Sequence, residues 1–236
     1  MIFRQLFDQE SYTYSYLLGD EETRQAILID SVLGNTDQTL LLLEQLDLKL
    51  CIALDSHTHA DHITGLGALR ARTSCTTMMG EQAVASCLSA TFKDGDQITV
   101  GNIRLEVIYS PGHTDDSYCF YLLSEGGGML FSGDTLLIRS TGRTDFQNGD
   151  AGQQYNSLFN RLLKLPDSCI VYPGHDYKGW VMSTIGEEKR NNPRLQIANQ
   201  SEYENLMNSL DLPSPKLMDV AVPANKACGH KVEKFV

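Results

Sequence analysis

The sequence is poor in positive charge and in long apolar runs. Its 236 residues hold 19 lysines and arginines against 30 aspartates and glutamates, a formal net charge of -11. An acidic surface repels phosphate backbones and anionic lipid head groups, so partnership with nucleic acid or a membrane is disfavoured. Apolar runs such as Leu40-Leu41-Leu42-Leu43 are far shorter than the roughly 18 residues that span a bilayer. Because the N-terminal residues lack the pattern of a secretion signal, we predict a cytoplasmic protein.

Closely spaced cysteine pairs are also missing. The six cysteines lie at wide, irregular intervals, and none form a C-x-x-C pair. This spacing excludes a zinc ribbon and a thioredoxin-like motif. In a cytoplasmic protein we expect free, mostly buried thiols, and Cys228 in its Ala-Cys-Gly context reads as a spare thiol.

The order of predicted elements favours an α/β protein. The chain shows no repeat, low-complexity segment or Pro/Gly/Ser-rich linker, so we predict one domain over residues 1–236 with a polar helical tail at about 182–211. Alternating or buried apolar runs predict strands, and apolar spacing of three to four residues predicts helices. The expected strands are 12–18, 25–30, 49–54, 96–100, 103–109, 118–123, 128–132 and 169–173, and the expected helices are about 35–47, 64–72, 152–164 and, less clearly, 81–88.

Four short segments with reactive side chains each follow a predicted strand, where loops hold such groups on a rigid frame. They are Ser56-His57-Thr58-His59-Ala60-Asp61-His62, Pro111-Gly112-His113, Ser132-Gly133-Asp134 and Pro173-Gly174-His175. In the first segment, His57 and His59 end a strand, and Asp61 and His62 are expected to begin the next helix. Imidazole nitrogens and carboxylate oxygens suit zinc, iron, manganese or nickel rather than calcium or magnesium. A solvated histidine-rich loop would explain H-x-H alone, but not this cluster together with the three later segments, so we predict a metal site.

The pattern H-x-H-x-D-H, followed by a glycine-flanked His, a G-D and a G-H, resembles the metallo-β-lactamase superfamily. The matching residues are His57, His59, Asp61, His62, His113, Asp134 and His175. The resemblance implies an α/β fold, an αββα sandwich of two mixed sheets flanked by helices, with the metal at one edge of the sheets. Since the superfamily hosts many chemistries, the fold leaves the function open.

Two chemistries fit these residues. A dinuclear zinc hydrolase, such as a glyoxalase II acting on a glutathione thioester, would hold one ion with His57, His59 and His113. The other ion would be held by Asp61, His62 and His175, with Asp134 bridging, and a bridging hydroxide would be the nucleophile. A mononuclear oxygenase needs only two imidazoles and one carboxylate on one face of Fe(II), which leaves positions open for O₂ and substrate. The remaining histidines and acids would then orient the ligands.

The sequence around these residues resembles the persulfide dioxygenase family, which includes the human ethylmalonic encephalopathy protein. The similar segments are Phe3-Arg4-Gln5-Leu6-Phe7, residues 131–139, 142–147 and 172–177, Glu187-Glu188, Asn192-Pro193-Arg194-Leu195 and Val222-Pro223-Ala224-Asn225. The resemblance implies one Fe(II) per chain, held by His57, His113 and Asp134, with His59, Asp61, His62 and His175 around them. It also implies the reaction, in which glutathione persulfide, O₂ and water give sulfite and glutathione.

Glutathione carries two carboxylates, so an acidic protein needs local cations to bind it. A guanidinium pairs with a carboxylate through two parallel hydrogen bonds, which makes Arg194 and Arg143 the candidate contacts, with Arg139 a weaker one. Tyr177, two residues after His175, is a candidate hydrogen-bond donor. The alternative is that these arginines cap helices or form structural ion pairs, as Arg143 would with Asp145.

The resemblance suggests a homodimer. No rhodanese pattern is present in the sequence, so we expect a separate sulfurtransferase or free glutathione persulfide to supply the sulfur. The chain departs from the family at Ser31, where relatives tend to have proline, and at Ser140-Thr141, where a cysteine is usual. Neither position is among the implied ligands.

Overall fold

A computed structural model describes residues 1–85, 87–124, 126–213 and 217–229 of the chain. The chain divides into two compact units. The first comprises Met1–Phe92, Thr99–Ile103 and the C-terminal part from Pro213, and the second comprises Lys93–Ile98 and Arg104–Leu212. Each unit contains most of one β-sheet and its own helices.

The first unit is built on a six-stranded mixed sheet in the order β1-β2-β3-β4-β5-β6. The first three strands are antiparallel neighbours, and β3 to β6 run parallel. Strands β2 and β3 are buried along almost their whole length, and they contribute Leu17, Ala26 and Leu28 to the core of this unit. The strands are β1 (Ile2–Phe7), β2 (Tyr14–Gly19), β3 (Gln25–Ile29), β4 (Lys49–Leu54), β5 (Thr76–Gly80) and β6 (Ala90–Phe92).

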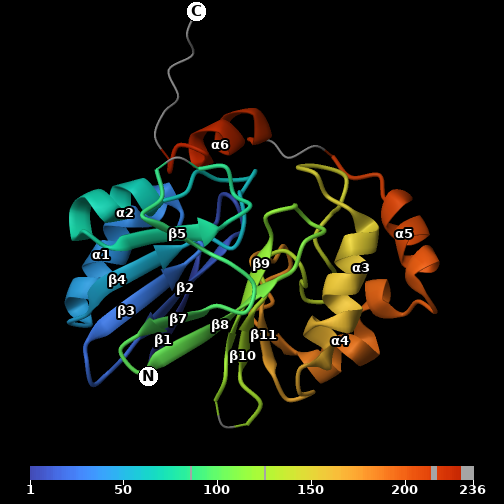
Figure 1. Ribbon diagram of the computed structural model, residues 1–236, viewed down its shortest axis with the longest axis horizontal. Coiled ribbons are helices and arrows are strands. Elements are labelled where there is room, and N and C mark those ends of the chain that lie inside the picture. The colour runs from blue at the N-terminus through green and yellow to red at the C-terminus, as the bar shows by residue number, and fades with distance from the viewer. Residues whose placement is uncertain (86, 125, 214–216, 230–236) are drawn as a thin grey trace, which may run out of the picture. The chain divides into compact units, whose positions relative to one another are not determined.

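Short helices connect and cover this sheet (Figure 1). Helix α1 (Thr36–Gln45) buries Leu43, and Leu40 and Leu46 pack partly buried beside it, as the predicted apolar face requires. Helix α2 (Leu66–Thr73) packs on β4 and β5. The remaining helical elements of this unit are the 3-10 helix η1 (Leu33–Asn35) and α6 (Met218–Asn225).

The second sheet is also six-stranded and mixed, in the order β12-β11-β10-β9-β8-β7. Strands β10 and β11 pair in parallel, and the neighbours β8–β9, β9–β10 and β11–β12 are antiparallel. The strands are β7 (Gln97–Val100), β8 (Ile103–Tyr109), β9 (Tyr118–Leu122), β10 (Met129–Phe131), β11 (Ile170–Tyr172) and β12 (Ser183–Thr184).

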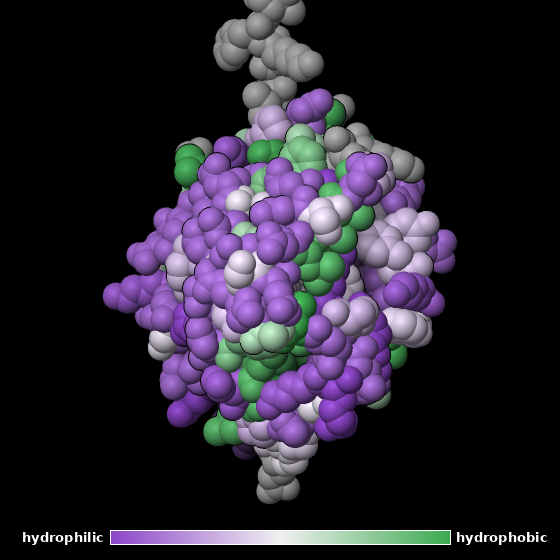
Figure 2. Space-filling view, turned by 90° about the vertical axis from the view of Figure 1, so that its right-hand side faces the viewer, coloured by the Kyte–Doolittle hydropathy of each residue, from purple (hydrophilic) through white to green (hydrophobic). Residues whose placement is uncertain are grey.

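The helices of the second unit follow its last strands. They are α3 (Ala151–Asn160), η2 (Leu162–Lys164), α4 (Ile185–Asn191), η3 (Pro193–Leu195) and α5 (Gln200–Asn208). Helix α3 starts with a side-chain cap, because Asp150 accepts from the backbone N–H of Gln153 at 2.7 Å. Helices α3 and α5 pack against each other around the buried Tyr203. Figure 2 shows a largely polar surface crossed by an apolar band.

The structure confirms the fold class, since two mixed sheets each carry helices. Three local predictions are wrong. The segment 81–88 forms turns rather than a helix as far as it is described. Asp61 and His62 lie in a loop, because α2 begins only at Leu66. Cys228 is not a spare thiol, since it is bonded to Cys87.

The other cysteines follow the prediction of free thiols. Cys75, Cys119 and Cys169 are buried, and Cys51 is partly exposed. Across the described segments of the chain, no helix combines the length and the apolar character that crossing a bilayer requires.

Candidate metal centre

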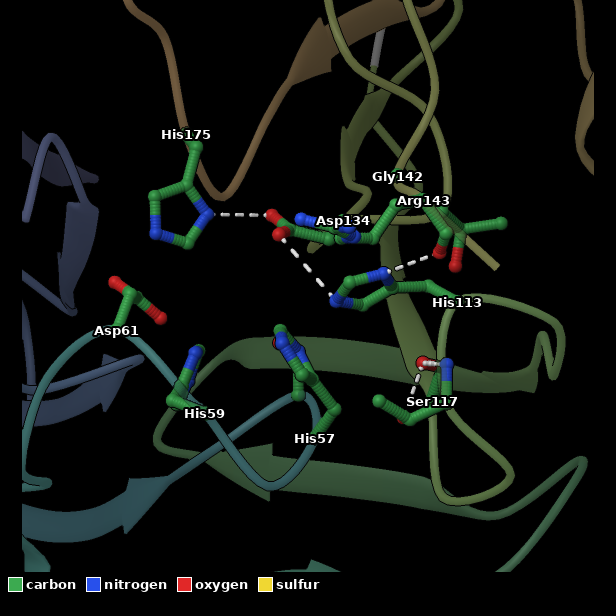
Figure 3. Close-up of polar contacts among 12 residues, drawn as sticks. His57, His59, Asp61, His113, Ser117, Asp134, Gly142, Arg143 and His175 are labelled. Atoms are coloured by element: carbon green, nitrogen blue, oxygen red, sulfur yellow. Dashed lines mark hydrogen bonds and ion pairs between the residues drawn. The ribbon is translucent and has the colours of Figure 1, made fainter. Parts of the chain in front are cut away.

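The first group of predicted site residues lies on the segment between β4 and α2, residues 55–64, which we call the histidine loop. It starts where the parallel strand β4 ends. His57, His59 and His62 are each at most 3% exposed. The His59 ring neighbours both of the other rings. Its centroid lies 4.2 Å from that of His57 and 4.3 Å from that of His62. Figure 3 shows His57 and His59 side by side on this loop. The turn that H-x-H requires is therefore present.

Asp30, at the end of β3, anchors the histidine loop. Its carboxylate accepts from the backbone N–H of Ser56 at 2.6 Å and from the Ser56 hydroxyl at 3.0 Å. Its Oδ1 also lies 3.2 Å from Nε2 of His59. Asp30 adopts a φ of 55°, a left-handed conformation that aspartate tolerates better than most residues. The Ser56 hydroxyl in turn lies 2.9 Å from Nδ1 of His57, so Asp30 positions two histidines, one of them through Ser56.

Buried charge around His59 alters its acid–base behaviour. Burial opposes protonation of this imidazole, but the hydrogen bond with Asp30 and the charges of Asp30, Asp55 and Asp61 outweigh it and raise the pKa of His59 to about 9. Burial also raises the pKa of Asp55 to about 7, against the opposing charge of His59. The donor atoms of Asp30, Asp55 and His59 lie within 4.8 Å of one another.

Asp61 and His62 contact each other and a residue just before β2. Oδ2 of Asp61 lies 3.0 Å from Nδ1 of His62. The Thr13 hydroxyl lies 3.0 Å from the same carboxylate oxygen and 3.2 Å from the same imidazole nitrogen. His59, Asp61 and His62 form a second group whose donor atoms lie within 4.8 Å of one another.

In the second unit, the loop after β8 presents His113 in a fixed orientation. Its Nδ1 lies 2.8 Å from the backbone carbonyl of Arg143, so Nδ1 carries the proton and donates. The opposite nitrogen, Nε2, lies 3.6 Å from Oδ2 of Asp134. The His113 imidazole therefore directs its Nε2 atom toward the carboxylate.

Asp134, which follows β10, lies between two histidines (Figure 3). Its Oδ2 faces His113, and its Oδ1 is 2.6 Å from Nδ1 of His175, which follows β11. His175 is 2% exposed, and the side chains of His113 and Asp134 are 14% and 12% exposed. The three residues from three separate strand ends thus meet at one end of the second sheet.

Two glycines make room for this arrangement. A Cβ on Gly142 would lie 2.2 Å from the carbonyl oxygen of Asp134 and 2.8 Å from Nδ1 of His113. A Cβ on Gly174 would lie 2.6 Å from Oδ1 of Asp134. Neither approach is open to a larger residue, so these glycines belong to the site as much as the polar side chains.

The predicted substrate-binding residues all lie in the second unit. Arg143 pairs with Asp145 through Nε–Oδ1 and Nη2–Oδ2 contacts of 2.7 Å, and its guanidinium stacks 4.5 Å from the Phe146 ring centre. Arg194 donates to the carbonyl and hydroxyl of Thr141, and burial lowers the pKa of Arg194.

The remaining two candidates differ in their surroundings. Tyr177 is 66% exposed, and its ring stacks on that of His175 with centroids 6.2 Å apart. Arg139 forms ion pairs with Glu187 and the fully buried Glu188. The ion pairs favour the structural reading of Arg139.

Sequence reasoning missed Asp30, Thr13 and Asn225 as residues of the site. Asn225 binds the histidine loop from α6: its side-chain amide donates to the carbonyls of His59 and His62 at 2.8 and 2.9 Å and accepts from the N–H of Thr64 at 2.8 Å. It lies more than 160 residues from the loop it contacts. Position along the chain gave no sign of this contact, although Asn225 lies within a segment that resembles the family.

Comparison with known proteins identifies the family of the chain. The family model of the metallo-beta-lactamase superfamily matches residues 9–87 and 88–175. The mouse protein named mitochondrial persulfide dioxygenase ETHE1 is 45% identical over 234 residues, which cover 97% of this chain and 89% of the mouse protein. The crystal structure of ETHE1 from Myxococcus xanthus is 53% identical, with a TM-score of 0.94 and coverage of 98% of this chain and all of that one.

A thioester hydrolase is a weaker match. A probable hydroxyacylglutathione hydrolase of Schizosaccharomyces pombe is 35% identical over 166 residues, which cover 70% of this chain and 64% of that protein. The persulfide dioxygenases match with higher identity over nearly the whole chain. The chain therefore belongs to the metallo-β-lactamase superfamily, whose histidine and aspartate groups imply a bound metal, and within it to the persulfide dioxygenases, which are oxidoreductases.

Proposed function

We propose that this protein oxidises glutathione persulfide with O₂ and water at one Fe(II) per chain, held by His57, His113 and Asp134. The proposal rests on membership in the persulfide dioxygenases. The single structural observation that supports it most is the orientation of His113. Its Nδ1 proton is committed to the Arg143 carbonyl, so Nε2 is the ligand atom, 3.6 Å from a carboxylate oxygen that can bind the same ion.

The donor set fits iron. Two imidazoles and one carboxylate are the ligands by which non-haem Fe(II) oxygenases hold the metal on one face. His57 suits the third position because the Ser56 hydroxyl contacts its Nδ1 and orients the imidazole, as the partners of metal-binding histidines do. When bound, Fe(II) would supply the redox chemistry that lets O₂ react with sulfur, a reaction for which the side chains have no group of their own.

The remaining acidic and imidazole side chains of the site form hydrogen bonds or ion pairs with neighbouring residues, which favours a site with one metal ion over a site with two. His175 binds Asp134, His59 binds Asp30, and Asp61 and His62 contact each other and Thr13. Such contacts orient ligands and raise their basicity. We propose that His59, Asp61, His62 and His175 act in this way rather than as ligands of a second ion.

We propose that Arg143, Arg194 and Tyr177 bind the glutathione part of the substrate. The net charge of -11 would repel a tripeptide with two carboxylates, so the guanidinium groups of the second unit have to compensate locally. The Arg194 guanidinium donates hydrogen bonds to the carbonyl and the hydroxyl of Thr141. The Arg143 guanidinium forms an ion pair with Asp145. These contacts hold each guanidinium in a fixed orientation before a carboxylate arrives.

The balanced reaction fixes what the site must do. The persulfide RSSH, one O₂ and one water give the thiol RSH, sulfite and two protons. The terminal sulfur gains three oxygens, two from O₂ and one from water, and the sulfur–sulfur bond breaks with the thiol as leaving group. The protein must therefore hold the persulfide beside the metal and admit one water, and positioning of this kind removes the cost of a bimolecular encounter.

The test is oxygen uptake by purified protein that contains stoichiometric iron. With glutathione persulfide we expect O₂ consumption and sulfite formation in a 1:1 ratio, and none with His113→Ala. Turnover of S-D-lactoylglutathione by protein that holds two zinc ions would instead support the thioester hydrolase. Iron-loaded protein that consumes no O₂ with the persulfide would refute the proposal.

We further propose a cytoplasmic location, a homodimer and a separate sulfurtransferase as the source of persulfide. Nucleic acid and membranes are not among the proposed partners because of the acidic charge. Size-exclusion chromatography with light scattering measures the oligomeric state directly, and cell fractionation measures the location.

A further inference from the structure

The C-terminal segment 217–229, which we call the C-terminal latch, lies against the histidine loop. Asn225 is 2% exposed and makes three hydrogen bonds to this loop, through the carbonyls of His59 and His62 and the N–H of Thr64. One amide therefore fixes the backbone on both sides of Asp61 and His62. Backbone groups buried in this way need these partners, because water cannot replace them without the latch moving away.

The latch also contacts the start of α2 directly. The backbone N–H of Gly67 donates to the carbonyl of Cys228 at 3.0 Å. A Cβ on Gly229 would lie 2.2 Å from the carbonyl of Thr64, so the two backbones approach as closely as glycine allows. The left-handed φ of 54° at Cys228 turns the chain at this contact.

Little apolar surface holds the latch in place. Helix α6 has eight residues and buries only Ala221, Ala224 and Asn225. It contains Pro223, which cannot donate a helical hydrogen bond. A helix this short is marginal without tertiary contacts, and two alanine methyl groups bury little area. The position of the latch therefore depends on the hydrogen bonds of Asn225 and on a covalent link between the latch and the rest of the unit.

That link is a disulfide. Cys228 is bonded to Cys87, 141 residues earlier in the chain, with Cα atoms 6.0 Å apart. Cys228 is 1% exposed, whereas Cys87 is only partly buried. Cys87 is thus the more accessible residue of the pair, and attack of a small thiol on its sulfur releases Cys228 as the thiolate.

We propose that the C-terminal latch is redox-sensitive. With the Cys87–Cys228 disulfide intact, Asn225 positions the histidine loop so that the loop retains the metal. Reduction of the disulfide loosens the latch and, with it, the histidine loop. A thiolate attacks the Cys87 sulfur and forms a mixed disulfide, and a second thiol resolves it. Two thiols are oxidised to one disulfide, and the two cysteines take up the two electrons and two protons. The reductant is any low-molecular-weight thiol. The inference uses the proposed role of His57 as a ligand, and it goes beyond the proposed reaction.

The test follows metal release rather than turnover. Protein loaded with Fe(II), and separately with Zn(II), is mixed with a chromogenic chelator, and the release rate is measured before and after reduction by dithiothreitol. We expect release roughly tenfold faster after reduction. Cys87→Ser should release metal at the fast rate without any reductant, which excludes a direct effect of dithiothreitol on the ion.

Asn225→Asp tests the positioning residue. This nearly isosteric change keeps an acceptor for Thr64 but replaces the donor to the carbonyls of His59 and His62 by an oxygen. We expect fast release in both oxidation states, with the disulfide still formed. Asn102→Ala is the matched control, since the Asn102 amide also donates two hydrogen bonds, to Asp20 and Glu22, away from the histidine loop. Cys51→Ser controls for loss of a partly exposed thiol.

The outcomes separate this proposal from the proposed reaction. Equal release rates in the oxidised and reduced protein would overturn it, as would wild-type release from Asn225→Asp or the absence of a Cys87–Cys228 peptide in a non-reducing digest. Protein that shows redox-dependent release of both ions but consumes no O₂ would keep the latch and refute the dioxygenase. Oxygen uptake by protein whose metal release does not depend on the disulfide would keep the dioxygenase and refute the latch.

Discussion

The backbone carbonyl of Arg143 accepts the Nδ1 proton of His113 at 2.8 Å. The same residue pairs its guanidinium with Asp145. Arg143 therefore has two roles. Its backbone carbonyl sets the tautomer of a proposed metal ligand, and its side chain is a candidate for substrate binding. Changes in the loop 141–143 should consequently affect metal and substrate together.

Gly142→Ala should disrupt this loop. The new Cβ would lie 2.2 Å from the carbonyl oxygen of Asp134 and 2.8 Å from the His113 ring, so the backbone or the imidazole has to move. We expect a loss of about 1–3 kcal/mol of stability and reduced iron content, measured by thermal unfolding and elemental analysis. Gly34→Ala is the control, because no atom lies within 4 Å of its added Cβ. Full iron content in Gly142→Ala would contradict the prediction.

His175→Ala should weaken metal binding without abolishing it. The Nδ1 atom of His175 holds Oδ1 of Asp134 at 2.6 Å, and loss of a group that orients a metal ligand typically costs 10- to 100-fold in affinity. Competition with a chelator of known affinity measures the effect. Asp134→Ala removes a proposed ligand itself, so its metal affinity serves as the reference for the loss of a ligand. An affinity for His175→Ala equal to that of Asp134→Ala would instead make His175 a ligand.

Arg194→Ala should raise KM for the persulfide with little change in iron content. The structure adds a complication, because Arg194 also donates to Thr141. Tyr203→Phe provides the comparison: the Tyr203 hydroxyl contacts Thr141 at 3.1 Å and Gln154 at 2.7 Å from the buried interior. If Arg194 binds substrate, only Arg194→Ala changes KM. Equal effects from both variants would assign Arg194 a purely structural role.

The free cysteines should differ in reactivity toward iodoacetamide. Burial raises the pKa of Cys169 to about 11 and also raises the pKa of Cys75. Since the thiolate is the nucleophile, both stay protonated at pH 8, and both are buried. The partly exposed Cys51 should be alkylated first, as peptide mass spectrometry would show. Reactivity at Cys169 should increase only as the pH approaches 11, and alkylation of Cys169 at the rate of Cys51 at pH 8 would contradict this.

The sequence predicted the strands that carry the site because their apolar runs end in reactive residues. Strand β4 ends directly before the histidine loop, and β8, β10 and β11 end shortly before His113, Asp134 and His175. The contacts of Asp134 with His113 and with His175 could not be predicted from this pattern, because they depend on how the three segments meet at one end of the second sheet.

The missed elements lack a local signal. Strand β5, Thr76–Gly80, contains threonine, methionine and glycine, and its pairing with β4 rather than its composition makes it a strand. Helix α6 contains a proline and buries few residues, so its apolar pattern is weak. Asp30 became part of the site only through contacts with residues 26 and 29 positions away, which no periodicity within one element reveals.

Every strand that leads into a segment of the site has a hydrogen-bonded neighbour on both sides. Strand β4 lies between β3 and β5, and β8, β10 and β11 are likewise interior strands of the second sheet. Arg194, by contrast, lies on a short helix outside both sheets. The proposed metal ligands and the proposed substrate contact Arg194 therefore lie on separate elements of the chain, so a substitution in η3 is expected to leave the strands that carry the ligands unchanged.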